Sequence, residues 1–212
     1  MSEAAARSWV VFGAGGHARS VIDVIERRGE RVAAVVGEPR GGTWRHRLLT
    51  DEAEGLDLTV EGGHGAVPAI GASAPRLGVV AALVARGWRG PALVAATATV
   101  APDVEPGPGT AILEHAHVGP ASRVGTAVIV NTGAVVEHDC TVGDGVHLGP
   151  GAYLLGAAHV GDRSFIGSGA RVLPGVRVGA DVTVGAGAVV VADVPDGATV
   201  VGIPARLVRP PG

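Results

Sequence analysis

The second half of the chain carries an aliphatic residue at every sixth position. Stepping by six from Val118, thirteen consecutive positions as far as Val190 are Val, Leu or Ile. Two residues before each of them stands a small side chain (Ala, Ser, Cys or Val), and glycine often follows directly. Weaker matches at Val100 and Ile112 extend the pattern backwards, with Pro106 as an imperfect step between them. A period of six residues therefore runs through this half.

A six-residue unit is too short to fold alone, so neighbouring units must stack and bury one continuous core. The aliphatic position is expected to point inward, where each side chain contributes about 1.5–3 kcal/mol of transfer free energy. The small residue two positions before it would sit at a tight corner. Cys140 stands at this small position, which also faces inward, and this favours a packing role over a nucleophilic one. The period predicts a parallel β-solenoid.

The first half alternates between apolar strands and helical patterns. Residues 8–29 read as a strand, a glycine-rich turn and a helix that ends at Gly29. Residues 39–62 show no clear period and predict a long surface loop or an extra short helix. Further strands are predicted in RVAAVVG (31–37), HGAVPAIG (64–71) and PALVA (91–95, leading into the repeat), and a second helix in APRLGVVAALVARG (74–87). This alternation predicts a small parallel sheet with right-handed crossovers.

Composition and charge exclude several classes of protein. The net charge of −3 gives no reason to expect nucleic acid as a partner. The sequence contains no run of about 18 apolar residues, so it predicts no membrane span although the hydrophobic content is 47%. The start of the sequence lacks the pattern of a secretory signal. A single cysteine excludes an internal disulfide and a cysteine-rich metal site. We therefore expect a cytoplasmic protein.

Two short stretches concentrate the candidate chemistry. GAGGHA (13–18) lies between a strand and a helix, where main-chain N–H groups and a helix N-terminus can hold a phosphate; a tight turn without ligand is the alternative. Dinucleotide redox chemistry fits poorly, because the next strand ends in Gly37 and only Glu38 could replace the usual acid. EHDC (137–140) places two acids and a histidine together in an otherwise unreactive run.

These features resemble known families. The six-residue period resembles the hexapeptide-repeat acyltransferases, whose fold is a left-handed parallel β-helix with three hexapeptides per coil. The glycine–histidine turn, the short α/β domain, EHDC and the C-terminal DVPDGATVVGIPARLV (193–208) resemble the sugar O- and N-acetyltransferases of the sialic acid and bacillosamine group. The resemblance implies a Rossmann-like domain at 1–94 that binds a sugar nucleotide, and a β-helix acetyltransferase domain at 95–212.

Carried over from that group, His138 is the catalytic base and Asp139 raises its basicity. Pro120, Gly156, Pro174 and Ala192 stand at intervals of 18 from His138, so the histidine is expected in an uncharged column. The resemblance also implies acetyl-CoA as co-substrate and no metal. The implied cofactor-binding residues are His147, which meets the acetyl group, Ser168, Ala186, Gly202 and Pro204. The implied acceptor-binding residues are Gly15, Gly16, His17, Glu38 and Gly71.

The spacing of two histidines also predicts the assembly. His138 and His147 lie nine residues apart, half of an 18-residue coil, so they should face different sides of one chain. Both can line one pocket only when neighbouring chains supply them, and we therefore expect a cyclic homotrimer, as in the resembling group. The acceptor is expected to be a sugar or sugar nucleotide, and amine and hydroxyl acceptors both remain open.

Two other classes of protein share some of these features. A γ-class carbonic anhydrase shares the β-helix but pairs two zinc-binding histidines four residues apart. The histidine spacings from His115 onward are 2, 21, 9 and 12, so that pair is absent. The second alternative is a non-catalytic, trimeric scaffold that binds sugar nucleotides. A decayed site would be expected to lose the EHD cluster, and here the cluster is intact. The acceptor contacts depart from the group, because ASAPR (72–76) keeps only Arg76.

Overall fold

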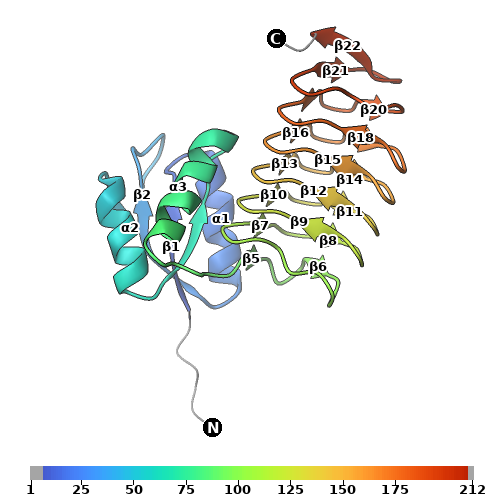
Figure 1. Cartoon of the computed structure of the whole chain (residues 1–212). Helices are drawn as coiled ribbons and strands as arrows, with labels where there is room; N and C mark the ends of the chain where they lie inside the picture. The colour runs from blue at the N-terminus through green and yellow to red at the C-terminus, as the bar shows by residue number, and fades with distance from the viewer. Residues whose placement is uncertain (1–6, 210–212) are drawn as a thin grey trace.

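The computed structural model describes residues 7–209 and consists of a small α/β domain beside the first coils of a parallel β-helix (Figure 1). The α/β domain contains β1 (Ser8–Phe12), α1 (Gly16–Arg27), β2 (Arg31–Val36), β3 (Leu48–Leu49), α2 (Glu52–Glu61), β4 (Gly65–Pro68) and α3 (Ser73–Ala85). Its four strands are parallel in the order β3-β2-β1-β4. The predicted fold class is confirmed.

Alternate residues of β1 supply the two faces of this sheet. Trp9 and Val11 join one apolar cluster with the buried side of α1, whereas Val10 and Phe12 join another with α2 and α3. This alternation is the two-residue period of a strand buried on both faces. Because β1 and β4 pair in parallel, their carboxyl ends lie at the same edge of the sheet, where the glycine-rich turn lies.

The aperiodic segment 39–62 contains an edge strand and a helix. Of the two predicted alternatives, the short helix is confirmed as α2, and the side chain of Asp51 caps it by accepting from Ala53 N at 2.8 Å. The edge strand β3 was not predicted. Only two residues, Leu48 and Leu49, pair with β2, and two residues are too few to show a period.

The β-helix consists mainly of two-residue strands, one for each hexapeptide. The strands are Leu93–Val94 (β5), Thr99–Val100 (β6), Ala111–Ile112 (β7), His117–Val118 (β8), Arg123–Val124 (β9), Ile129–Val130 (β10), Val135–Val136 (β11), Thr141–Val142 (β12), His147–Leu148 (β13), Tyr153–Leu154 (β14), His159–Val160 (β15), Phe165–Ile166 (β16), Arg171–Val172 (β17), Arg177–Val178 (β18), Thr183–Val184 (β19), Val189–Val190 (β20), Thr199–Val201 (β21) and Arg206–Arg209 (β22). From β8 to β20 every predicted aliphatic position is the second residue of a strand.

The strands form three faces, and we name each after one central strand. The β13 face is β22-β21-β19-β16-β13-β10-β7-β5, the β14 face is β20-β17-β14-β11-β8-β6, and the β12 face is β18-β15-β12-β9. Neighbours within a face pair in parallel, typically 18 residues apart, as Val135 pairs with Tyr153; the exception is β22, which pairs antiparallel with β21. PALVA supplies β5, which pairs with β7 and so forms the first rung of the β13 face. At Pro106 the period breaks, and the β12 face begins one coil later.

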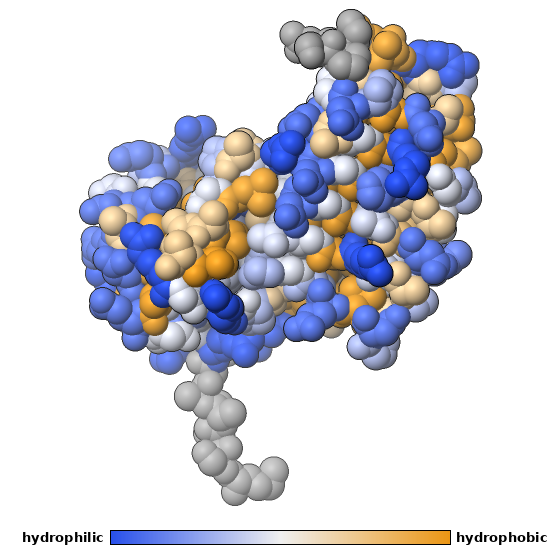
Figure 2. Space-filling model, in the orientation of Figure 1, coloured by the Kyte–Doolittle hydropathy of each residue, from blue (hydrophilic) through white to orange (hydrophobic). Residues whose placement is uncertain are grey.

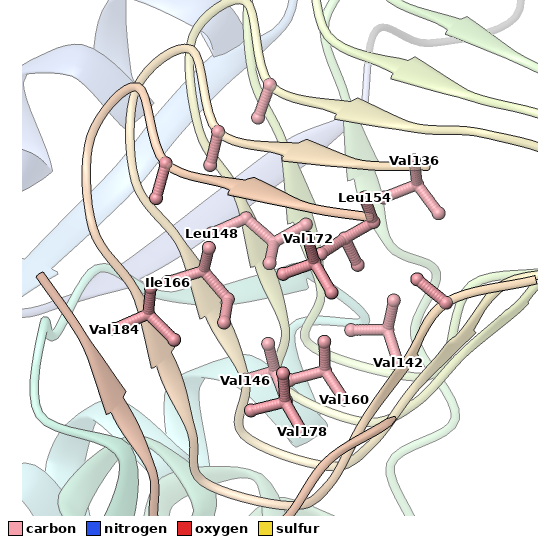
Figure 3. Packing of buried hydrophobic residues seen from close by; sticks show 14 of the residues in the cluster. Val136, Val142, Val146, Leu148, Leu154, Val160, Ile166, Val172, Val178 and Val184 are labelled. Atoms are coloured by element: carbon pink, nitrogen blue, oxygen red, sulfur yellow. The ribbon is translucent and has the colours of Figure 1, made fainter. Parts of the chain in front are cut away.

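Aliphatic side chains from the three faces meet in the interior (Figure 3). Leu148, Leu154 and Val160, one from each face, are fully buried. Cys140 fills the predicted small inward position, and burial raises the pKa of its thiol. A buried, protonated thiol packs and does not attack.

Apolar side chains also reach the surface near the C-terminal end of the β-helix (Figure 2). The exposed ones there are Val191, Val201, Ile203, Leu207 and Val208. Within residues 7–209, no helix combines the length and the apolar character needed to cross a membrane.

Candidate active site

His138 and Asp139 lie on the turn that joins β11 to β12, at an outer corner of the β-helix. Asp139 has a left-handed backbone with φ of 60°, and its N–H donates to Pro120 O one coil below. This turn aims both side chains outward, where each is about 60% exposed. Nδ1 of His138 lies 2.8 Å from a carboxylate oxygen of Asp139.

This contact assigns the ring proton of the neutral histidine. A carboxylate accepts hydrogen bonds, so Nδ1 carries the proton and donates it to Asp139. Nε2 is then the unprotonated nitrogen with its lone pair directed away from the acid. A histidine oriented in this way can take a proton from a bound acceptor, and the carboxylate stabilises the imidazolium that results.

Gly156, one coil above, leaves the space that the His138 ring occupies. A Cβ at Gly156 would lie 2.7 Å from both Cε1 and Nε2 of that ring. We therefore expect Gly156→Ala to displace the ring and lower kcat, with the fold intact because the ring is exposed and free to move. Steady-state kinetics and thermal unfolding test this. Unchanged kcat would show that the ring position observed here is not the working one.

His147 lies on the β13 face, far around the coil from His138. Its Nε2 is 3.3 Å from the side-chain amide nitrogen of Asn131. The ring centroids of Phe165 and His17 lie 5.2 and 6.2 Å from that of His147, and the Phe165 ring is packed edge-on. Burial, with smaller effects from the charges of Arg76 and His17, lowers the pKa of His147 to about 4. The ring is therefore neutral at neutral pH.

The depressed pKa of His147 predicts how stability depends on pH. Between about pH 6.5, where an unfolded histidine gains its proton, and about pH 4, the unfolded chain binds a proton that the folded chain does not. Stability falls as the pH drops through this range, by at most about 1.4 kcal/mol per pH unit for this histidine. We expect His147→Gln to flatten the fall, as measured by urea unfolding at several pH values. Equal slopes in both proteins would contradict the assignment.

The glycine-rich turn and the end of β4 enclose a cavity of about 530 Å³. All five residues predicted to bind the acceptor line it: Gly15, Gly16, His17, Glu38 and Gly71. Gly13 requires glycine, because its φ is +112° and a Cβ would lie 2.7 Å from Ala69 O. Sequence reasoning missed Arg40 and Ile70, which also line the cavity. Arg40 lies in the aperiodic segment, so no pattern marked it.

His17 connects this cavity with His147. It occupies the first turn of α1, and its Nε2 is buried without a hydrogen-bond partner among the described residues. Burial lowers its pKa, and the charge of Arg76 adds to that effect. A buried polar atom without a partner costs free energy, which a ligand in the cavity would recover by bonding to it.

The remaining predicted cofactor residues follow one exposed edge of the β13 face. Ser168 and Ala186 occupy equivalent turns of successive coils, and Gly187 N donates to Ser168 O at 2.9 Å. Gly202 and Pro204 lie in the turn after β21. An extended ligand such as acetyl-CoA can lie along such an edge because the side chains there are small or absent.

Within one chain, the predicted site residues lie in two separate places. His17, His147 and the cavity lie together beside the β13 face, whereas His138 and Asp139 lie at the corner between the β14 and β12 faces. That corner is opposite the β13 face. No group of three or more His, Cys, Asp or Glu side chains in residues 7–209 could hold a metal ion.

Comparison with known families and structures places both halves of the chain. Residues 9–83 match the PglD N-terminal domain, and residues 157–192 match the bacterial transferase hexapeptide (six repeats). No curated protein sequence matches the chain.

Several solved structures are similar over nearly the full length. The acetyltransferase domain of PglB from Neisseria gonorrhoeae, in complex with acetyl coenzyme A, is 33% identical with a TM-score of 0.88, over 96% of this chain and 100% of that one. PerB from Caulobacter crescentus, in complex with CoA and GDP-perosamine, is 38% identical with a TM-score of 0.85, over 96% of this chain and 98% of that one. WeeI from Acinetobacter baumannii is 26% identical with a TM-score of 0.84, over 95% and 100%.

Proposed function

The chain belongs to the hexapeptide-repeat sugar acetyltransferases with a PglD-type N-terminal domain, and we propose that it transfers the acetyl group of acetyl-CoA to the amine of a nucleotide-linked amino sugar. The relative in complex with GDP-perosamine and CoA supports an amine acceptor and this pair of substrates. The α/β domain takes the sugar nucleotide, and the β-helix, whose first rung is β5 (Leu93–Val94), takes acetyl-CoA. A single free cysteine fits the reducing cytoplasm as the place of reaction.

The observation that carries the proposal is the His138–Asp139 pair, with Nδ1 bound to the carboxylate and Nε2 left open. The acceptor amine attacks the carbonyl carbon of the thioester while Nε2 takes its proton. The new C–N bond forms, the C–S bond breaks, and the imidazolium returns the proton to the thiolate of CoA. We assign the stabilisation of the negative charge on the carbonyl oxygen to His147, whose neutral ring carries a single N–H that must face the acetyl group when acetyl-CoA is bound. Both substrates are bound at once, and no acyl-enzyme on Cys140 is required.

The separation of the predicted site residues into two places supports assembly as a homotrimer with sites between subunits. A base on one corner and a cavity beside the opposite face cannot serve one substrate within a single chain. A cyclic trimer brings the corner of one subunit beside the face of the next and generates three equivalent sites.

Ala186 tests the placement of acetyl-CoA along the exposed edge. Replacing Ala186 with Trp places a bulky side chain where only a methyl group stands, so we expect the KM for acetyl-CoA to rise about tenfold or more. The KM for the acceptor should change much less, because the acceptor cavity lies on another domain. Steady-state kinetics with each substrate varied in turn measures both. Equal changes would contradict this placement.

The proposed reaction is tested by incubating the protein with acetyl-CoA and a nucleotide-linked amino sugar and analysing the products by mass spectrometry. The sugar nucleotide should gain one acetyl group. Initial rates with both substrates varied should give intersecting lines in a double-reciprocal plot, as a ternary complex requires, and parallel lines would indicate an acyl-enzyme. Binding of the sugar nucleotide without any acetylated product would favour the alternative, a non-catalytic scaffold.

A further inference from the structure

Arg76, in the first turn of α3, is a fully buried cation that joins the two domains. Its Nε donates to Ala127 O at 2.7 Å and its Nη2 to Gly145 O at 2.5 Å, both on the β-helix. Its Nη1 donates to Ile70 O and Gly71 O, at 2.7 and 2.8 Å, on the α/β domain. One planar guanidinium thus bonds three separate segments of main chain.

The segments that Arg76 bonds belong to the two parts of the acceptor side. Ile70 and Gly71 form one wall of the cavity that also contains His17. Gly145 and Val146 directly precede His147, and Nη2 of Arg76 lies 3.5 Å from Val146 O. Arg76 therefore links the strand that carries His147 to the cavity wall through one side chain.

Within residues 7–209, every hydrogen-bond partner of Arg76 is a main-chain carbonyl, and none is a carboxylate. Burial lowers the pKa of Arg76 to about 10, so it keeps its charge at neutral pH. The titratable groups that act on His147 are Arg76 on α3 and His17 on α1, and both oppose its protonation, whereas the main chain of Gly71 favours it. An unpaired buried charge acts over longer distances than an exposed one, because little solvent screens it.

We propose that Arg76 is a positioning residue for acetyl transfer: it holds the Ile70–Gly71 wall of the acceptor cavity against the strand that carries His147. Its charge also adds to the effect of burial, which is the larger cause of the lowered pKa of His147. The proposal rests on the function proposed above. It assigns Arg76 no contact with either substrate. A purely structural role would give stability alone, without a selective effect on the acceptor or on the titration of His147.

Two variants separate geometry from charge. Arg76→Lys keeps the charge but has a single nitrogen that cannot reach Ala127, Gly145 and Gly71 together, whereas Arg76→Met removes the charge as well. We expect Arg76→Lys to lower kcat/KM for the acceptor by roughly 10- to 100-fold, the size of effect that a misplacement of about 1 Å produces, with the KM for acetyl-CoA unchanged. Arg86→Lys, on the exposed C-terminal end of α3 where Arg86 bonds Asp57, is the matched control and should behave like the wild type.

Ring titration of His147 by NMR, in the protein without substrates, supplies a readout that needs no acetyl transfer. In Arg76→Met the midpoint should rise from about 4 but stay below 6.5, because burial remains as the larger cause, and in Arg76→Lys it should stay near that of the wild type. An unmoved midpoint in Arg76→Met would overturn the electrostatic part even when no sugar is acetylated. Wild-type kcat/KM in Arg76→Lys, or proportional changes in the KM of both substrates, would overturn the positioning part. If Arg76→Met does not fold, the kinetics of Arg76→Lys decide the positioning proposal.

Discussion

Replacement of His138 by alanine is expected to lower kcat by roughly 10²–10⁴-fold, the usual contribution of a general base. The loss follows because no other side chain of the column stacked with His138 is ionisable: Pro120, Gly156, Pro174 and Ala192 offer no substitute. Folding and the KM for acetyl-CoA should persist, since the side chain is 60% exposed and contributes little to the core.

The experiment measures kcat and both KM values for His138→Ala, with circular dichroism and thermal unfolding as checks of the fold. Asp139→Asn should cost less, because the amide still orients the ring but no longer stabilises the imidazolium. His159→Ala, on β15 of the β12 face, is the control and should keep full activity. Near-normal turnover in His138→Ala would show that positioning of the substrates alone accounts for the rate.

Mixing two inactive variants is expected to restore activity if each site lies between subunits. His138→Ala lacks the base on the corner, and His147→Ala lacks the histidine beside the cavity. In randomly mixed trimers about a quarter of the interfaces combine an intact corner with an intact face, so activity should return to about a quarter of the wild-type value. Relative to His138→Ala alone, the gain is on the order of 100-fold, given the loss expected without the base.

Co-expression with two different affinity tags isolates the mixed assemblies, and analytical ultracentrifugation gives their mass. The control pairs His138→Ala with the double variant His138→Ala/His147→Ala, a mixture in which no interface is complete. Mixed trimers without activity would place both histidines in one chain's site and contradict the assembly argument. A fully active monomer would do the same.

The repeat made the β-helix predictable down to single side chains. A period of six requires the same inward position in every unit, and from Val118 to Val190 each such residue is buried as expected. The glycine-rich turn was equally informative, because a tight turn between a strand and a helix leaves few arrangements. All five acceptor-side residues inferred from it and from the family resemblance line one cavity.

Features that depend on contacts between distant segments could not be predicted from the sequence. Leu48 and Leu49 form an edge strand only because β2 offers them a partner. The low pKa of His147 arises from burial and from Arg76, a residue 71 positions away in the sequence that the fold places beside it. The sequence marks Arg76 only as the one residue that ASAPR (72–76) keeps of the resembling group's pattern. Its bonds to two domains become visible only when both domains are packed together.

The release of free CoA in the presence of a panel of sugar nucleotides tests the central claim most directly. Purified protein is incubated with acetyl-CoA and with amino-sugar nucleotides, matched hydroxy-sugar nucleotides or the free amino sugars, and the thiol is followed with a chromogenic disulfide. The account predicts rapid thiol release with at least one nucleotide-linked amino sugar, and slow or no release with its hydroxy and free-sugar counterparts. Equal background release with every compound, or faster release with hydroxy sugars, would contradict it.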